Sequence, residues 1–147
     1  MCVILYFWKY KLKHQVKTPT PYRLPHKYLC DFIVQYRFYM PTEGGRKAGI
    51  PKQGYRPGFR YPVDETENPR YEQIWMIDPE FTDKDGKVIR DNTIELPVEG
   101  KARIRFVSER MRDMHKDYIK PGVKAFFAEG PIIVAECVVI EILPVMY

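Results

Sequence analysis

The segment from Leu29 to Met40 constrains the fold more strongly than any other part of the sequence, because its side chains alternate in character. They divide into two sets, one with Phe32, Val34, Tyr36 and Phe38 and the other with Ile33, Gln35, Arg37 and Tyr39. Successive side chains of a β-strand point to opposite faces of a sheet. The segment is therefore predicted to be a strand with one apolar face, which ends before Pro41.

Further short extended segments follow along the chain. In order they are residues 55–63, 71–77, 93–96, 102–107, 123–127 and 132–143. Pro57 and Pro62 favour a sheet edge for the first of these, since proline cannot donate a ladder hydrogen bond. The fourth is expected to turn Ala102, Ile104 and Phe106 toward the core. The last is a nearly continuous apolar run, typical either of a strand buried on both faces or of a long, bent strand.

One short helix and one tight turn are predicted among these strands. Ser108 can cap a helix that runs to Tyr118, and Pro121-Gly122 would end it. Its apolar stripe would hold Met111, Met114 or His115, and Tyr118. The residues 83–86 read Asp-Lys-Asp-Gly, like the start of a calcium loop, but Ile94 stands where an EF-hand needs its Glu. We therefore predict a hairpin turn there.

Composition favours a single β-rich domain. The 147 residues include 11 Tyr, 8 Phe, 13 Pro and 9 Gly, which favour strands and turns over long helices. Many short strands separated by such turns are typical of a closed antiparallel barrel. The three cysteines, Cys2, Cys30 and Cys137, form no Cys-x-x-Cys pair, and we expect a reduced, cytoplasmic compartment.

The net charge of +5 is unevenly distributed. Residues 1–62 carry 12 basic and 2 acidic side chains, whereas residues 63–147 carry 12 and 17. A basic half can attract phosphate backbones or an acidic protein surface. The alternative is that these charges solvate loops and sheet faces.

The N-terminal segment stands apart from the strand pattern. Residues 1–14 are apolar and aromatic and then basic, too short to span a bilayer, and the lysines follow the apolar run rather than precede it as in a signal peptide. The segment is compatible with an extra strand, a weak membrane-surface anchor or an extension outside the fold. Proline-containing residues 18–25 resemble a stiff linker. We expect residues 1–27 to be an extension, residues 28–147 to form the barrel, and no transmembrane segment.

Several short motifs occur in a fixed order along the chain. They are Glu43-Gly44-Gly45-Arg46, Gly54-Tyr55-Arg56-Pro57-x-Phe59, Gly122-Val123-Lys124, Glu129-Gly130, Val134 and Val138-Val139. Over residues 32–143 this set resembles the third domain of bacterial elongation factor Tu. In that family the domain is a small β-barrel that helps to hold aminoacyl-tRNA and packs on a GTPase domain.

The resemblance implies an all-β fold, a closed antiparallel six-stranded β-barrel with one short helix. Residues 64–91 exceed what the family needs and are expected to form an extended mid-chain excursion. The family's Arg-Glu-Gly-Gly-Arg-Thr is Ala-Glu-Gly-Pro-Ile-Ile at 128–133, and losing two arginines weakens an RNA site. Arg46 is retained beside Lys47 in the loop that lies near the tRNA in the family, and Lys124 keeps a charge at another matched position.

No catalytic, metal or cofactor motif is recognisable. Gly44 and Gly49 have the spacing of a P-loop, but Ile50-Pro51 replaces the Lys and hydroxyl residue that hold phosphates and magnesium, so GTP binding is not expected. The polar residues Glu109, Asp113 and His115 could form an acid–base set, but such spacing more often marks a solvated helix face. We predict a non-enzyme without a cofactor.

Two main functions are compatible with these patterns. The first is a translation-associated module that binds tRNA, another RNA or a protein partner. Its candidate binding residues are Arg46, Lys47, Lys52, Tyr55, Arg56, Arg60 and Lys124. The alternative is a protein–protein interaction module, such as an immunity-type protein that binds a toxin, which the lost arginines and the gained Pro131-Ile132-Ile133 favour. A third, weaker hypothesis is peripheral membrane binding through the N-terminal segment.

Overall fold

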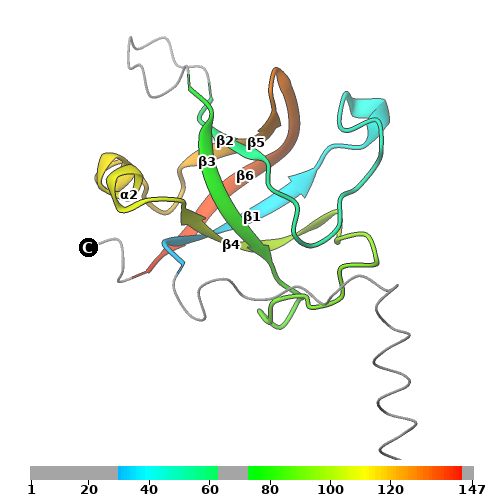
Figure 1. Ribbon diagram of the computed structural model, residues 1–147, viewed down its shortest axis with the longest axis horizontal. Helices are drawn as coiled ribbons and strands as arrows, with labels where there is room; N and C mark the ends of the chain where they lie inside the picture. The colour runs from blue at the N-terminus through cyan, green and yellow to red at the C-terminus, as the bar shows by residue number, and fades with distance from the viewer. Residues whose placement is uncertain (1–29, 63–72, 144–147) are drawn as a thin grey trace, which may run out of the picture.

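Six strands close into an antiparallel barrel in the part of the chain that the computed structural model describes, residues 30–62 and 73–143 (Figure 1). The strands are β1 (Phe32–Phe38), β2 (Gly58–Arg60), β3 (Trp75–Phe81), β4 (Glu99–Phe106), β5 (Lys124–Glu129) and β6 (Ile132–Ile142). A 3-10 helix η2 (Pro41–Glu43) follows β1, and the α-helix α2 (Glu109–His115) joins β4 to β5. Around the barrel the order is β1-β4-β3-β2-β5-β6, and β6 pairs with β1. The predicted fold class is confirmed.

Aromatic side chains fill the barrel. The first strand has the predicted polarity, with Phe32, Val34, Tyr36 and Phe38 all buried. Phe81 lies edge-on to Tyr36, with ring centroids 5.2 Å apart, and such pairs contribute about 0.5–1.5 kcal/mol beyond the area they bury. The Tyr36 hydroxyl donates to the Pro97 carbonyl at 3.0 Å, so its polar end is satisfied, and burial raises the pKa of this phenol well above its usual value.

The middle of the chain contributes a barrel strand rather than an appendage. Residues 75–81, which lie within the predicted excursion 64–91, form β3 between β4 and β2. The predicted strand at 71–77 ends too early, and its first two residues lie outside the described part. The sequence gives no sign that the strand continues to Phe81, because two carboxylates and a proline, Asp78, Pro79 and Glu80, are unusual inside a strand. Arg105 on β4 binds the Asp78 carboxylate at 2.7 Å and offsets its charge.

Two further strand predictions need correction. Pro57 and Pro62 flank β2 instead of placing it at a sheet edge, since β2 pairs with both β3 and β5. Residues 93–96 form no strand and contribute only an isolated bridge between Glu95 and Lys52. The turn at 83–86 is confirmed, because the Asp83 carboxylate accepts hydrogen bonds from the main-chain N–H groups of residues 85 and 87.

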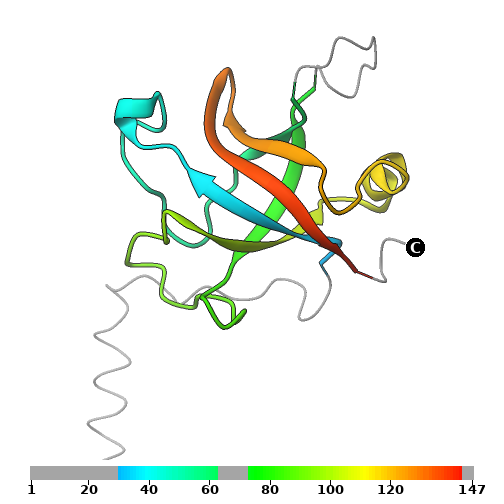
Figure 2. The ribbon, with the colours of Figure 1, turned by 180° about the vertical axis from the view of Figure 1, so that it is seen from behind.

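The long C-terminal strand β6 adopts the bent alternative of the two predicted for it (Figure 2). It pairs with β5 on one side and β1 on the other, and its register with β1 shifts between Ile33 and Val34. Its side chains alternate, so Val139 and Cys137 are buried while Val138 and Ile140 lie on the outer face. Such an irregularity increases the local twist that a closed barrel requires.

The helix α2 is anchored to the barrel by the buried ring of His115 and by Arg112, whose Nε donates to the buried Asp31 carboxylate at 2.5 Å. Ser108 caps it as predicted, and its hydroxyl accepts a hydrogen bond from the Met111 N–H. Of the predicted stripe, His115 is the fully buried member. Its ring stacks on Phe106, and its Nδ1 lies 2.7 Å from the Tyr61 hydroxyl. His115 therefore packs the helix against the barrel, and the expectation that it lies on a solvated helix face is wrong.

Candidate functional site

Arg46, the arginine that matches the family motif, binds other groups of the same chain. Its Nε donates to the Glu129 carboxylate at 2.7 Å, and its NH1 group donates to the Gly49 carbonyl at 2.9 Å. The guanidinium also lies over the ring of Tyr55, 4.8 Å from its centroid. The charge is thus shared with a carboxylate at the end of β5, and Arg46 ties the loop after β1 to the β5–β6 hairpin.

Tyr55 completes this arrangement. Its hydroxyl donates to the same Glu129 carboxylate, and its ring lies against Phe38 of the core. Burial, and then the bond to Glu129, raise the pKa of this phenol well above its usual value. A ring held by Arg46 on one side and by the core on the other is not available to stack on a nucleobase.

Steric constraints explain why two glycines, Gly44 and Gly45, precede Arg46. Gly44 adopts φ +87°, in the left-handed region, and ends η2. A Cβ on Gly45 would lie 2.2 Å from the Tyr39 carbonyl oxygen, so the chain passes there only without a side chain. Glu43 accepts from the Met40 N–H and from Arg37, and these bonds, in that order, lower the pKa of its carboxyl. The Glu-Gly-Gly-Arg motif therefore shapes a loop.

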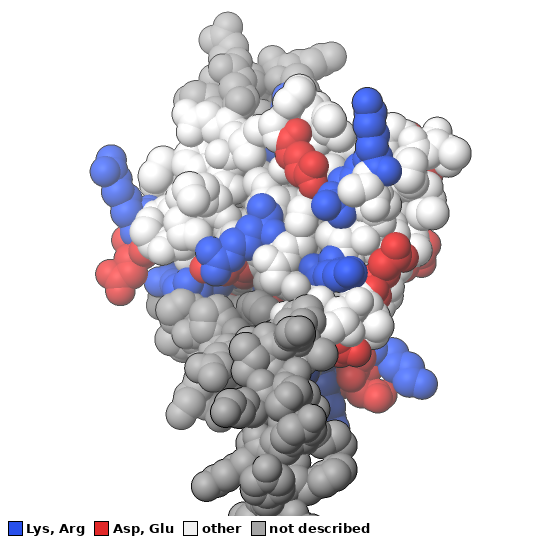
Figure 3. Space-filling view, turned by 45° about the vertical axis from the view of Figure 1, so that its right-hand side comes forward, with Lys and Arg blue, Asp and Glu red and all other residues white. Residues whose placement is uncertain are grey.

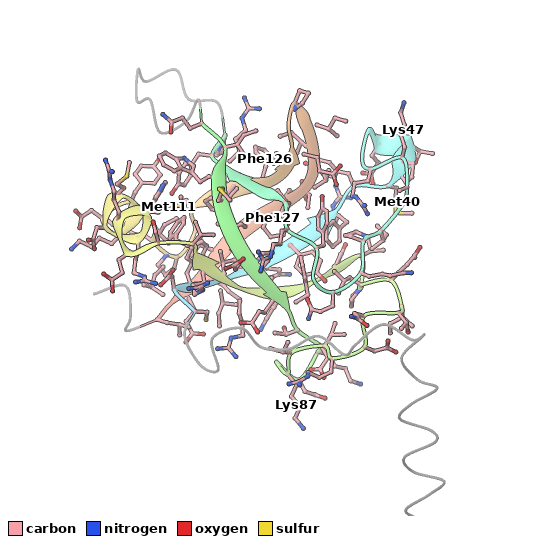
Figure 4. The ribbon with its side chains drawn as sticks, in the orientation of Figure 1. Met40, Lys47, Lys87, Met111, Phe126 and Phe127 are labelled. Atoms are coloured by element: carbon pink, nitrogen blue, oxygen red, sulfur yellow. The ribbon has the colours of Figure 1, made fainter. Side chains whose placement is uncertain are left out.

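The other predicted cations do not gather into one surface. Arg56 is 67% exposed but pairs with Asp78 at 3.2 Å, and Lys47 projects from the loop after η2 (Figure 4). Lys52 and Lys124 are exposed and Arg60 is half-buried. Lys124 begins β5, whereas Arg46 binds Glu129 at the other end of the same strand. The two ends are about 17 Å apart, since each strand residue adds about 3.4 Å. On the face in Figure 3, basic and acidic side chains are interspersed.

A groove of about 760 Å³ lies on the outer face of the barrel across β1, β6 and β5. Its apolar lining comes from Tyr39, Pro62, Phe126, Val138 and Ile140. Val138 and Ile140 are 38% and 36% exposed, and as alternate residues of β6 they lie next to each other on its outer face. We call this surface the β6 groove.

Charged side chains border the β6 groove, and two of them neutralise each other. Arg37 donates through Nε to Glu136 at 3.1 Å, and the Tyr39 hydroxyl donates to the other Glu136 oxygen at 3.0 Å. Lys124 and Glu99 also line the groove, and neither forms an ion pair within the described residues. The groove thus combines an apolar floor with a rim in which some charges remain available.

Sequence reasoning missed this groove apart from Lys124. The signal available in the sequence was the run at 132–143, in which both alternating sets are apolar. One set is buried in the barrel, and the other, with Val138 and Ile140, faces outward. A strand whose two faces are both apolar, in a barrel whose interior needs only one of them, leaves the second for a partner.

The chain has no match among known protein-family models, and no curated protein matches it. The resemblance to the third domain of elongation factor Tu therefore rests on its motifs and stays a prediction. Across residues 30–62 and 73–143, no group of three or more His, Cys, Asp or Glu side chains is placed to hold a metal ion. Within the same residues, no helix has the length and apolar character to cross a membrane.

Proposed function

We propose that this protein is a non-catalytic module that binds another protein through the β6 groove. The observation that carries the proposal is the exposed apolar floor formed by Val138, Ile140 and Phe126 inside a charged rim. Apolar surface with a polar border is the usual composition of a protein interface, where the centre excludes water and the rim sets orientation.

Protein binding is favoured over the RNA-binding alternative by the state of the predicted cations. Arg46 and Arg56 each pair with a carboxylate, and Tyr55 is held between Arg46 and the core. RNA affinity rests on cations free to replace counterions and on rings free to stack. RNA binding through Lys47, Lys52 and Arg60 stays a prediction. A role in translation and a cytoplasmic location stay predictions too.

Site-directed photo-crosslinking in the native cell tests the proposal. A benzophenone amino acid replaces Val138 in the groove or Val107, an equally exposed valine between β4 and α2, as the matched control. We expect a discrete protein adduct from position 138 that is absent at position 107 and disappears when Ile140→Asp is added. Equal adducts at both positions, or none at position 138, would contradict the proposal.

Filter binding of tRNA over a salt series separates the two functions. We expect no salt-dependent retention at about 150 mM salt, because the paired arginines release few counterions. Retention at that concentration, lost in a Lys47→Glu, Lys52→Glu double variant and kept in Val138→Asp, would favour RNA instead.

A further inference from the structure

Four charged side chains among the described residues line the β6 groove, and they alternate in sign across it. They lie on four neighbouring strands, in the order Glu99 on β4, Arg37 on β1, Glu136 on β6 and Lys124 on β5. Across the sheet their charges are therefore negative, positive, negative and positive. Together they carry no net charge, so this lining favours neither an acidic nor a basic partner.

The register of the strands fixes where these charges lie. Glu99, Arg37 and Glu136 are paired across β4, β1 and β6, so they form one row. Lys124 pairs with Val138, which lies two residues along β6 from Glu136. Neighbouring strands are about 4.8 Å apart and alternate residues of a strand about 7 Å apart. Glu99 and Lys124 are thus roughly 16 Å from each other along the surface, at the two ends of the groove.

This order of charges is complementary to itself. A two-fold axis that lies in the plane of the contact and passes midway between Glu99 and Lys124 places each of them opposite the other in a second copy. The same axis passes between β1 and β6, so Arg37 of one copy comes next to Glu136 of the other. A two-fold contact uses the same patch on both molecules and needs such self-complementarity. The order negative, positive, positive, negative would instead oppose like charges.

The apolar side chains of the groove follow the same symmetry. Phe126 lies two residues after Lys124 on β5, and Tyr39 lies two residues after Arg37 at the end of β1. With the strand spacings above, the axis carries Phe126 of one copy onto the ring of Tyr39 of the other, and both side chains line the groove. Val138 comes over the aliphatic stem of Arg37, which can cover apolar surface while its charged end stays paired. The two-fold contact therefore covers the apolar floor.

We propose that the β6 groove is the interface of a two-fold homodimer, so that its occupant is the same groove of a second copy of this chain. Glu99 and Lys124 form no ion pair within the part of the chain that the structure describes, and they pair across the interface at its two ends. The Arg37–Glu136 pairs of the two copies meet at its centre. This assignment rests on the proposed function and names the partner.

Analytical ultracentrifugation of the purified full chain under reducing conditions tests this assignment. We expect the mean mass to rise with concentration, between about 5 and 500 μM, from that of one chain toward that of two. Glu99→Lys and Lys124→Glu should each weaken self-association by about tenfold, because each reversal opposes like charges at both ends of a two-fold contact.

A mixture of the two variants decides between a two-fold contact and a general effect of charge. The Glu99→Lys chain has two lysines at the ends of its groove and the Lys124→Glu chain has two glutamates, so a mixed dimer pairs opposite charges at both ends. We expect the mixture, and the double variant Glu99→Lys/Lys124→Glu alone, to dimerise about as tightly as the wild type.

Lys87→Glu is the matched control, because Lys87 is exposed on the turn after β3, away from the groove (Figure 4). Unchanged circular dichroism of each variant shows that the fold is kept. The assignment is overturned if the wild-type chain stays monomeric at about 500 μM, if the mixture associates no better than the separate variants, or if Lys87→Glu has the same effect as Lys124→Glu.

The two proposals fail in different ways. A position-138 adduct that contains a different protein, together with a purified chain that stays monomeric, removes the second copy as the partner and leaves the protein-binding function. Loss of the adduct preference for position 138 over position 107 removes that function itself.

Discussion

Two triads of identical composition lie on this barrel, and they differ in what they join. In one, Glu129 accepts from Arg46 and Tyr55; in the other, Glu136 accepts from Arg37 and Tyr39. In each the guanidinium covers the tyrosine ring, at 4.8 Å in the first and 5.0 Å in the second. The first connects a long loop to the β5–β6 hairpin. The second lies on the outer face of β1 and β6, whose backbones are already hydrogen-bonded to each other.

The two triads share a composition but differ in how far they are exposed and in what holds the segments around them. The Arg46–Glu129 pair is less exposed, with 23% and 40% of the side chains accessible against 33% and 50% for Arg37–Glu136. Removal of the first triad frees one end of a loop that is otherwise held by an isolated bridge from Lys52 to Glu95 and by the Gln53 side chain, whereas removal of the second leaves the β1–β6 ladder intact. We therefore expect the first triad to stabilise the fold and the second to shape the β6 groove.

The largest expected effect concerns the loop that carries Arg46. Gly45→Ala places a Cβ 2.2 Å from the Tyr39 carbonyl oxygen, so backbone must move and the loop must shift. We expect a loss of about 3 kcal/mol in the free energy of unfolding, as for overpacking. Gly44→Ala is the control, because its Cβ meets nothing within 4 Å and only its positive φ is unfavourable, by about 1–2 kcal/mol. Urea unfolding that gives equal losses would show that the close approach is unimportant.

Replacement of the two central carboxylates compares the triads directly. Glu129→Ala removes the acceptor of both Arg46 and Tyr55, and we expect it to lower stability by about 1–2 kcal/mol, a charge-assisted bond reduced for its partial exposure. Glu136→Ala should have a smaller effect. Thermal or urea unfolding of both variants decides the matter, and a larger loss for Glu136→Ala would reverse our assignment of roles.

Much of the fold could be predicted because the first strand alternates regularly between apolar residues and more polar ones. Phe32 to Phe38 alternate, and a period of two has one structural meaning. The third strand could not be predicted to its end, because Asp78 and Glu80 face Arg105 and Arg103 across β4, and a pairing of charges between distant strands leaves no local signal.

The candidate site was less predictable than the fold. The motifs that carry the resemblance meet in space, since Arg46 from one motif and Tyr55 from the next both bind Glu129 of a third. One role of these motifs is therefore to tie the loop after β1 to the β5–β6 hairpin. The β6 groove depends on which face of β6 turns outward, and a continuous apolar run does not reveal that.

The phenol of the first triad should make stability depend on alkaline pH. The raised pKa of Tyr55 means that the unfolded chain loses this proton first, near pH 10, so the native state is favoured below that value and loses the advantage as pH rises above it. Between about pH 9 and pH 11 we expect wild-type stability to fall by about 1 kcal/mol more than that of Tyr55→Phe. Tyr39→Phe should remove less of the fall, and identical pH profiles for wild type and Tyr55→Phe would contradict the buried role.

The smallest effect on stability should come from the groove itself. Val138 is exposed on a strand held on both sides by ladder hydrogen bonds, so Val138→Asp should lower the free energy of unfolding by no more than about 1 kcal/mol, the span of strand propensities. Val107→Asp, outside any strand, should change it by no more than about 0.5 kcal/mol. The two variants should separate only in the proposed partner binding, which we expect Val138→Asp to abolish and Val107→Asp to leave unchanged. A large loss of stability in Val138→Asp alone would mean that this valine is part of the core, and the contrast between a structural triad and a binding groove would then fail.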